Sequence, residues 1–288
     1  MEKLLDNKRS SLLVFILTVG VFGIINTEMG VVGIIPLIAE TFNVTVPQAG
    51  WTVSAFAFMV AIAGPIMPLL FSGINRKKVM LLALGIFVIS NIISMVTTNF
   101  TVILIARIIP AIFHPIYVSM AFSVAASSVP KEQAPKAVSK IFIGVSAGMV
   151  LGVHVTSLIA SETSFSSSML FFSIVSALVF IATIFLIPSI PVTERLSYGA
   201  QLSVLENAIT WNSIIAVTFI NGAMFGFFSF MSDYLKNITE VSFKVISIML
   251  FIYGGANIIG NIIAGKLLVQ MPSKTIKTIP FLLFAVYI

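Results

Sequence analysis

Long apolar segments recur along the chain, and each approaches the ~20 residues that an α-helix needs to cross a bilayer. Hydrophobic residues fill 58% of the 288 positions and charged residues only 9%. A soluble protein needs a more polar surface, so the expected fold class is an all-α polytopic membrane protein. The predicted spans are 11–36, 49–72, 79–97, 101–124, 141–160, 169–187, 212–231 and 245–268, with a ninth beginning near Thr278.

Basic residues gather on one side of these spans. If the N-terminus is cytoplasmic, thirteen of the sixteen Lys and Arg residues fall in cytoplasmic segments, and Arg107 lies within a span. The positive-inside rule therefore predicts that orientation. The net charge of +6 then reflects topology, so we expect a lipid bilayer and no nucleic acid as partner. The cytoplasmic set is Lys3, Lys8, Arg9, Arg76, Lys77, Lys78, Lys131, Lys136, Lys140, Arg195, Lys266, Lys274 and Lys277.

The longest polar break, residues 189–210, divides the chain. We predict a six-span N-terminal bundle at 1–188, a cytoplasmic linker at 189–210 and a partial second bundle at 211–288. The segment from Thr278 to Ile288 offers roughly 16 Å of helix against a hydrocarbon core of about 30 Å. We therefore expect a C-terminally truncated chain whose second bundle is incomplete.

Few residues are suited to catalysis or to a cofactor. The chain has no Cys and only two His, which excludes disulfides and thiol-ligated metals. Neither an enzyme, nor a bound metal, nor any other cofactor is expected.

Two intramembrane charges are the strongest candidates for function. Glu28 lies in the first span and Arg107 in the fourth. A charge in hydrocarbon costs roughly 2.5–3.5 kcal/mol on insertion scales and is usually functional. At 1.5 Å per residue, the two lie about 12 Å and about 9 Å below the outer surface, so they can meet. The alternative is a buried ion pair, or two separately hydrated groups, that only fixes helix packing.

Three short runs carry a family resemblance. Residues 27–30 read Thr-Glu-Met-Gly, residues 36–39 read Pro-Leu-Ile-Ala, and residues 46–50 read Val-Pro-Gln-Ala-Gly. Together they resemble bacterial major facilitator superfamily transporters of the twelve-span drug:proton antiporter group, close to the sugar, nucleoside and chloramphenicol-type exporters. The resemblance implies a monomer in the cytoplasmic membrane that exports a small drug-, sugar- or nucleoside-like solute by alternating access. It gives Glu28 the role of proton carrier. Arg107 would pair with Glu28, directly or through water, and would tune the pKa of its carboxylate.

Two further motifs are similar to this family. Gly73, Arg76, Lys77 and Lys78 stand where it has a cytoplasmic gating loop, although Ser72 and Asn75 replace the expected aspartate and second glycine. A positive-inside anchor explains the basic residues equally well.

The glycines of the fifth span, one helical turn apart, resemble the antiporter motif, but Val153-His154 stand where a proline is usual. A plain helix-packing stripe would look the same. These glycines are Gly144, Gly148 and Gly152.

Other intramembrane polar residues could line a cavity or simply bond between helices. For His114 and His154, the satisfied polar residue is the preferred interpretation. Two other functions stay open: a truncated fragment without transport activity, and a channel or receptor, for which the sequence offers neither a polar pore stripe nor a large extramembrane domain. The possible cavity-lining residues are Asn26, Thr27, His114, His154 and Asn221.

Overall fold

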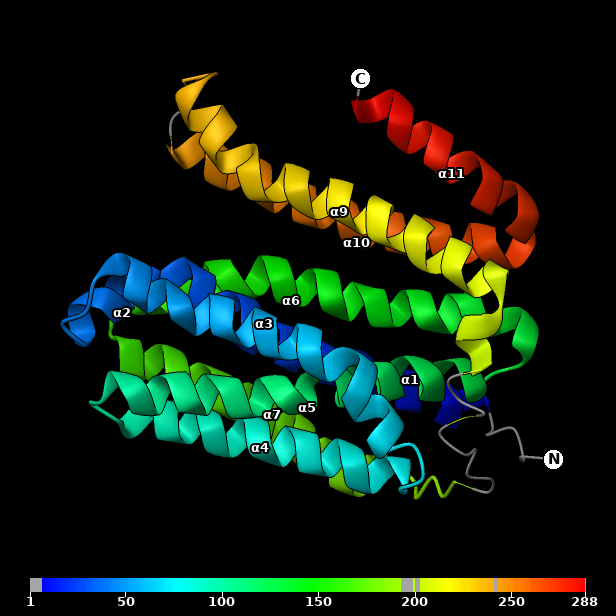
Figure 1. Cartoon of the computed structure of the whole chain (residues 1–288), viewed down its shortest axis with the longest axis horizontal. Coiled ribbons are helices and arrows are strands. Elements are labelled where there is room, and N and C mark those ends of the chain that lie inside the picture. The colour runs from blue at the N-terminus through cyan, green and yellow to red at the C-terminus, as the bar shows by residue number, and fades with distance from the viewer. Residues whose placement is uncertain (1–6, 193–198, 200–202, 241–242, 288) are drawn as a thin grey trace.

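The computed structural model describes residues 7–192, 199, 203–240 and 243–287, and within them the chain is helical without any β-strand. Figure 1 shows long helices running back and forth along one direction. The all-α membrane fold is therefore confirmed. The elements are α1 (Asn7–Gly30), η1 (Val31–Ile34), α2 (Ile35–Thr41), α3 (Val46–Leu70), α4 (Arg76–Val96), α5 (Phe100–Ser127), η2 (Lys131–Gln133), α6 (Ala134–Glu162), α7 (Phe165–Leu186), η3 (Ser203–Glu206), α9 (Ala208–Asn237), α10 (Phe243–Gln270) and α11 (Pro272–Tyr287).

Seven segments of the described residues are long and apolar enough to cross a membrane. Six correspond to the predicted spans of the first bundle, and the seventh, Phe251–Gln270, lies in α10. The predicted span at 212–231 falls in α9, of which Ala208–Met224 qualifies as a shorter apolar helix. The last helix, α11, begins at Pro272, earlier than the predicted Thr278.

The predicted linker is described only in part. Residues 193–198 and 200–202 lie outside the described residues, and with them Glu194 and Arg195; Lys3 also lies outside. Ser203–Glu206 form the 3₁₀ turn η3, after which α9 begins. The division at 1–188, 189–210 and 211–288 stays a prediction.

The outer faces of the helices are apolar. Phe15, Phe58, Phe185 and Phe219 are 63%, 65%, 78% and 74% exposed. In water, exposed aromatic side chains on this scale would promote aggregation. Such side chains are suited to contact with lipid.

The first predicted span is broken where the site forms. Helix α1 ends at Gly30, a 3₁₀ turn follows, and α2 resumes with Pro36 in its first turn. Proline suits a first turn because its missing N–H has no partner to lose there. The chain therefore changes its helical winding just beyond Glu28.

Glycines let α6 approach α1 closely. A Cβ on Gly144 would collide with the Thr18 carbonyl, and one on Gly148 would lie 2.8 Å from Cβ of Ile25. A Cβ on Gly152 would lie 3.1 Å from Cα of Asn26. The stripe of small residues therefore forms the α1–α6 contact.

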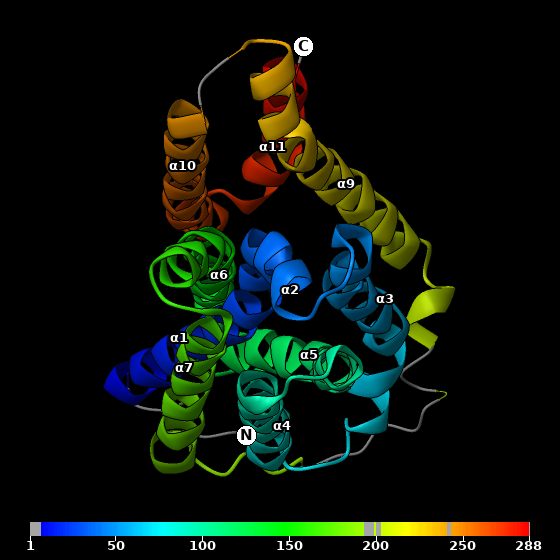
Figure 2. The same cartoon turned by 90° about the vertical axis from the view of Figure 1, so that its left-hand side faces the viewer.

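Helix α10 packs on the other side of α6, so α6 lies between the N-terminal helices and the later part of the chain. Figure 2 shows α10 beside α6, with α9 and α11 on the same side of α6 as α10. This junction borders the cavity described below.

Candidate functional site

A cluster of charged and polar side chains lies where α1, α3 and α5 meet. Oε2 of Glu28 lies 3.1 Å from Nε2 of His114, within ion-pair distance. The two side chains are 15% and 10% exposed, so water can reach both. Both ring nitrogens of His114 are buried, and neither forms a hydrogen bond with any of the described residues, so the approach to Glu28 is an ion-pair distance without hydrogen-bond geometry.

Arg107 binds the backbone beside this pair. Its guanidinium donates from Nη1 to the carbonyl of Thr27 at 2.8 Å, from Nη2 to that of Glu28 at 3.2 Å, and from Nε to that of Thr52 at 3.4 Å. The side chain is 3% exposed, and its Cζ atom lies 4.7 Å from the centre of the Phe56 ring. A planar fork of donors can reach several carbonyls at once.

The sequence placed Glu28 and Arg107 at matching depth, and the structure brings them together in a different way from a carboxylate–guanidinium pair. Arg107 holds the carbonyl of Glu28, whereas the carboxylate lies against His114. His114 follows Arg107 by seven residues, two turns of α5, so both project from one face of that helix. The functional roles of all three stay predictions.

Thr27 and Asn26 do not line the cavity described below. The Thr27 hydroxyl donates to the Gly23 carbonyl at 3.0 Å and accepts from Nδ2 of Asn91 at 3.4 Å. Asn91 also donates to Ser176 at 3.3 Å, so α1, α4 and α7 are joined by side-chain hydrogen bonds. Asn26 is fully buried, and its amide has no partner among the described residues.

His154 lies apart from the Glu28 cluster. Its Nδ1 atom is 2.7 Å from the Val150 carbonyl of its own helix, and its ring meets Phe251 of α10 edge-on at 6.3 Å. The geometry is that of a satisfied polar residue at a helix contact.

The predicted gating loop packs on the end of α7. Nζ of Lys77 donates to the Ile184 carbonyl at 2.7 Å, and the backbone N–H of Arg76 donates to the Ile190 carbonyl at 3.0 Å. Asn75 donates to Ser189 at 2.8 Å. The loop thus ties α3 and α4 to the segment after α7. A cation on the last carbonyls of a helix is favourable.

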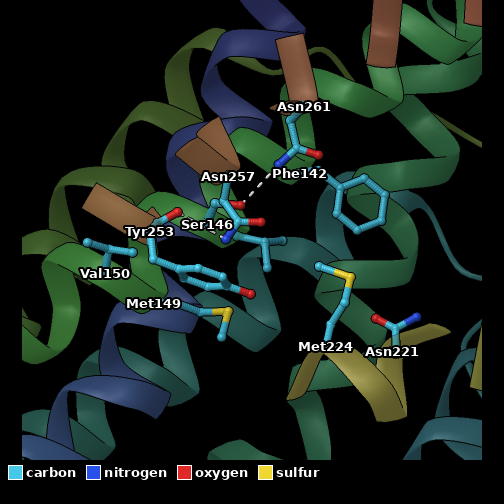
Figure 3. A pocket seen from close by; sticks show the side chains of 10 residues that line it. Phe142, Ser146, Met149, Val150, Asn221, Met224, Tyr253, Asn257 and Asn261 are labelled. Carbon is cyan, nitrogen blue, oxygen red and sulfur yellow. Dashed lines mark hydrogen bonds between the residues drawn. The ribbon is translucent and has the colours of Figure 1, made fainter. Parts of the chain in front are cut away.

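A cavity of about 340 Å³ lies between α6, α9 and α10. Figure 3 shows the side chains of all three helices around it. Its described lining has no charged residue. It consists of apolar side chains together with several carboxamide and hydroxyl groups. Of the predicted cavity residues only Asn221 lines it. The lining is Phe142, Val145, Ser146, Met149, Val150, Asn221, Met224, Tyr253, Asn257 and Asn261.

The carboxamides of this cavity are partly engaged. Asn221 and Asn257 donate to carbonyls one turn back in their own helices, at 2.9 and 3.3 Å. Asn261 donates to the Ser146 hydroxyl at 3.0 Å, which joins α10 to α6. Each carboxamide still has a carbonyl oxygen that can accept a hydrogen bond.

Sequence reasoning missed Asn91, Asn257 and Asn261. All three are amides in apolar helices, which is the signal used for Glu28, and Asn257 and Asn261 stand one turn apart. Within the described residues, no three His, Asp or Glu side chains gather into a possible metal site.

Comparisons with known proteins agree with this architecture. The Major Facilitator Superfamily profile matches residues 16–288. The inner membrane transport protein YdhP of Escherichia coli is 27% identical over 94% of this chain and 69% of its own length. The uncharacterized MFS-type transporter YtbD of Bacillus subtilis is 30% identical over 91% of this chain and 66% of its own length.

Solved structures are similar in fold. The proton:xylose symporter XylE matches with a TM-score of 0.69 at 15% identity, over 91% of this chain and 70% of that protein. The human organic anion transporter MFSD10 matches with a TM-score of 0.67 at 15% identity, over 85% of this chain and 70% of that protein. At this identity the likeness concerns the fold. With a profile match over most of its length, the chain belongs to the Major Facilitator Superfamily of membrane transporters.

Proposed function

We propose that the protein is a proton-coupled exporter of a small, uncharged organic solute that works by alternating access. The observation that carries this proposal is the contact between the Glu28 carboxylate and the His114 imidazole inside a membrane-spanning bundle. The two atoms lie 3.1 Å apart without a hydrogen bond, and a small rotation of either side chain would align them so that one proton could pass between the acid and the imidazole.

Arg107 supplies the fixed part of this site. Because Arg107 holds the carbonyls of Thr27 and Glu28, it anchors the backbone at the end of α1 without occupying the Glu28 carboxylate. Its guanidinium stays protonated under ordinary conditions, so it biases the pair electrostatically without carrying the proton itself. Proton binding and release at Glu28 and His114 would then alter charge beside the junction of α1, α3 and α5.

The cavity supports an uncharged solute. Its described lining offers amide and hydroxyl groups on a mainly apolar wall. An ion entering it would lose hydration without meeting an opposite charge, which is unfavourable. Drug-, sugar- and nucleoside-like molecules that combine an apolar face with hydrogen-bonding groups meet these conditions.

The test is efflux of a panel of neutral and charged solutes from cells that express the chain, with and without a protonophore. We expect efflux of a neutral solute that stops when the proton gradient collapses, and that is lost in Glu28→Gln. The matched control is Glu40→Gln, because Glu40 is an exposed acid on α2. Efflux that survives the protonophore would refute proton coupling, and efflux confined to charged solutes would refute the proposed solute class.

A further inference from the structure

A second pocket lies outside the site described above, between the start of α1, the turn after α5 and the start of α6. It has a volume of about 210 Å³. Its polar lining consists of Ser10, Ser11, Gln133, Lys136 and Lys140. Neither the proton-coupling site nor the solute cavity uses any of these residues.

The pocket is positively charged. Lys136 and Lys140 stand one turn apart on α6, and like charges at this spacing destabilise a helix. Neither lysine forms an ion pair with any residue that the structure describes. The acid nearest in sequence, Glu132, is exposed on η2. An anion bound between the two lysines would relieve their repulsion.

The walls of the pocket are fixed by a buried hydrogen bond. The Ser10 hydroxyl donates to the Ser128 carbonyl at 2.8 Å, which joins the start of α1 to the turn between α5 and α6. Ser10 is 4% exposed, whereas Ser11 is open to solvent. The pocket is therefore a shaped recess, and the two lysines are held at its edge by helix α6.

Its position matches the headgroup region of a membrane. Both α1 and α6 begin at the same end of the bundle, the right-hand end in Figure 1. Exposed Arg9 adds a third positive charge there. Phe15, one turn beyond Ser11, is 63% exposed, so an apolar surface continues from the pocket along α1.

We propose that this pocket binds the phosphate of an anionic phospholipid, whose acyl chains lie along the exposed apolar face of α1. The lysines recognise the phosphate, as basic recesses at the cytoplasmic surface do for acidic headgroups. A soluble phosphate compound shares the charge but lacks the chains that would contact Phe15. The lipid is thus favoured by the apolar surface beside the charge.

The experiment titrates phosphatidylglycerol into the purified chain in neutral detergent and counts bound lipid by native mass spectrometry. We expect lower affinity for phosphatidylcholine, and weaker phosphatidylglycerol binding by roughly tenfold in the double variant Lys136→Gln/Lys140→Gln. Lys136→Arg/Lys140→Arg should retain binding because the charge remains. The matched control is Lys274→Gln/Lys277→Gln, a pair of exposed lysines on α11.

Three results would overturn the proposal. If phosphatidylglycerol binding weakens equally in the Lys136/Lys140 and Lys274/Lys277 glutamine variants, the effect comes from lost charge in general and not from this pocket. Equal binding of phosphatidylcholine would remove the role of charge, and competition by glycerol phosphate at lipid-like concentration would assign the pocket to a soluble anion. If the Lys136/Lys140 variant fails to fold, Ser11→Glu provides the same test, since an acid at this exposed edge should weaken binding.

Discussion

Nε2 of His114 lies 3.1 Å from Oε2 of Glu28, across the contact between α5 and α1. Arg107 stands two turns earlier on α5 and holds the backbone of the same glutamate. One helix thus supplies both the group that meets the acid and the group that anchors its main chain. One side chain of α5 therefore contacts the carboxylate of Glu28, and another contacts its backbone.

Replacing His114 tests the contact directly. His114→Phe leaves the Glu28 carboxylate without its nearest described partner and should lower the free energy of unfolding by about 1–3 kcal/mol. His114→Gln keeps a hydrogen-bonding group within reach and should lower it by less than about 1 kcal/mol. The measurement is unfolding in mixed micelles at neutral pH.

A matched control is His154→Phe, because His154 bonds to its own helix. Losing that single bond should cost about 1 kcal/mol. Equal stabilities of His114→Phe and His114→Gln would show that the contact with Glu28 contributes nothing to folding.

Arg107 is expected to resist substitution by lysine. Its planar fork reaches three carbonyls, whereas a lysine ammonium is compact and cannot span them. Arg107→Lys should therefore destabilise the protein by about 2–3 kcal/mol, the value of a lost charge-assisted hydrogen bond. Arg9→Lys, at an exposed position, should be neutral in the same unfolding assay. Equal effects would contradict the anchoring role of Arg107.

The helices and the proximity of Glu28 to Arg107 could be predicted because both follow from local sequence. Apolar runs of the required length define spans, and 1.5 Å per residue places Glu28 near Arg107. The choice of partner could not be predicted, since it depends on how α5 rotates against α1. That rotation decides that the carboxylate meets His114 and the guanidinium meets carbonyls.

The break at Gly30 was missed for a related reason. Residues 11–36 are continuously apolar apart from Glu28 and a few small polar groups, so hydropathy shows a single span. The 3₁₀ turn at Val31–Ile34 is visible only in the backbone. Arg107 binds carbonyls just before that turn.

The α1–α6 contact should tolerate no added methyl group. A Cβ at Gly144 collides with the backbone carbonyl of Thr18, which cannot move without shifting α1. Gly144→Ala should therefore lower stability by about 1–3 kcal/mol despite the better helix propensity of alanine. Gly255→Ala is the control, because no described atom lies within 4 Å of the added carbon.

In unfolding measurements, Gly255→Ala should be neutral or stabilising by up to about 1 kcal/mol. A Gly144→Ala protein as stable as this control would show that α1 and α6 separate more easily than their close approach indicates.

Tyr117 offers the opposite case, a substitution that should stabilise. Its side chain is fully buried, and its hydroxyl points at Gly20 of α1 without a hydrogen-bond partner among the described residues. An unsatisfied buried polar group costs about 1–3 kcal/mol. Tyr117→Phe removes it while keeping the ring, so the free energy of unfolding should rise by about 1 kcal/mol or more.

Tyr117→Leu, which loses the ring as well, should instead destabilise the protein, because it leaves a gap between α5 and α1. A lower stability for Tyr117→Phe would mean that the hydroxyl makes a favourable bond, for instance to a buried water, and that this bond helps join the two helices that carry Glu28 and Arg107.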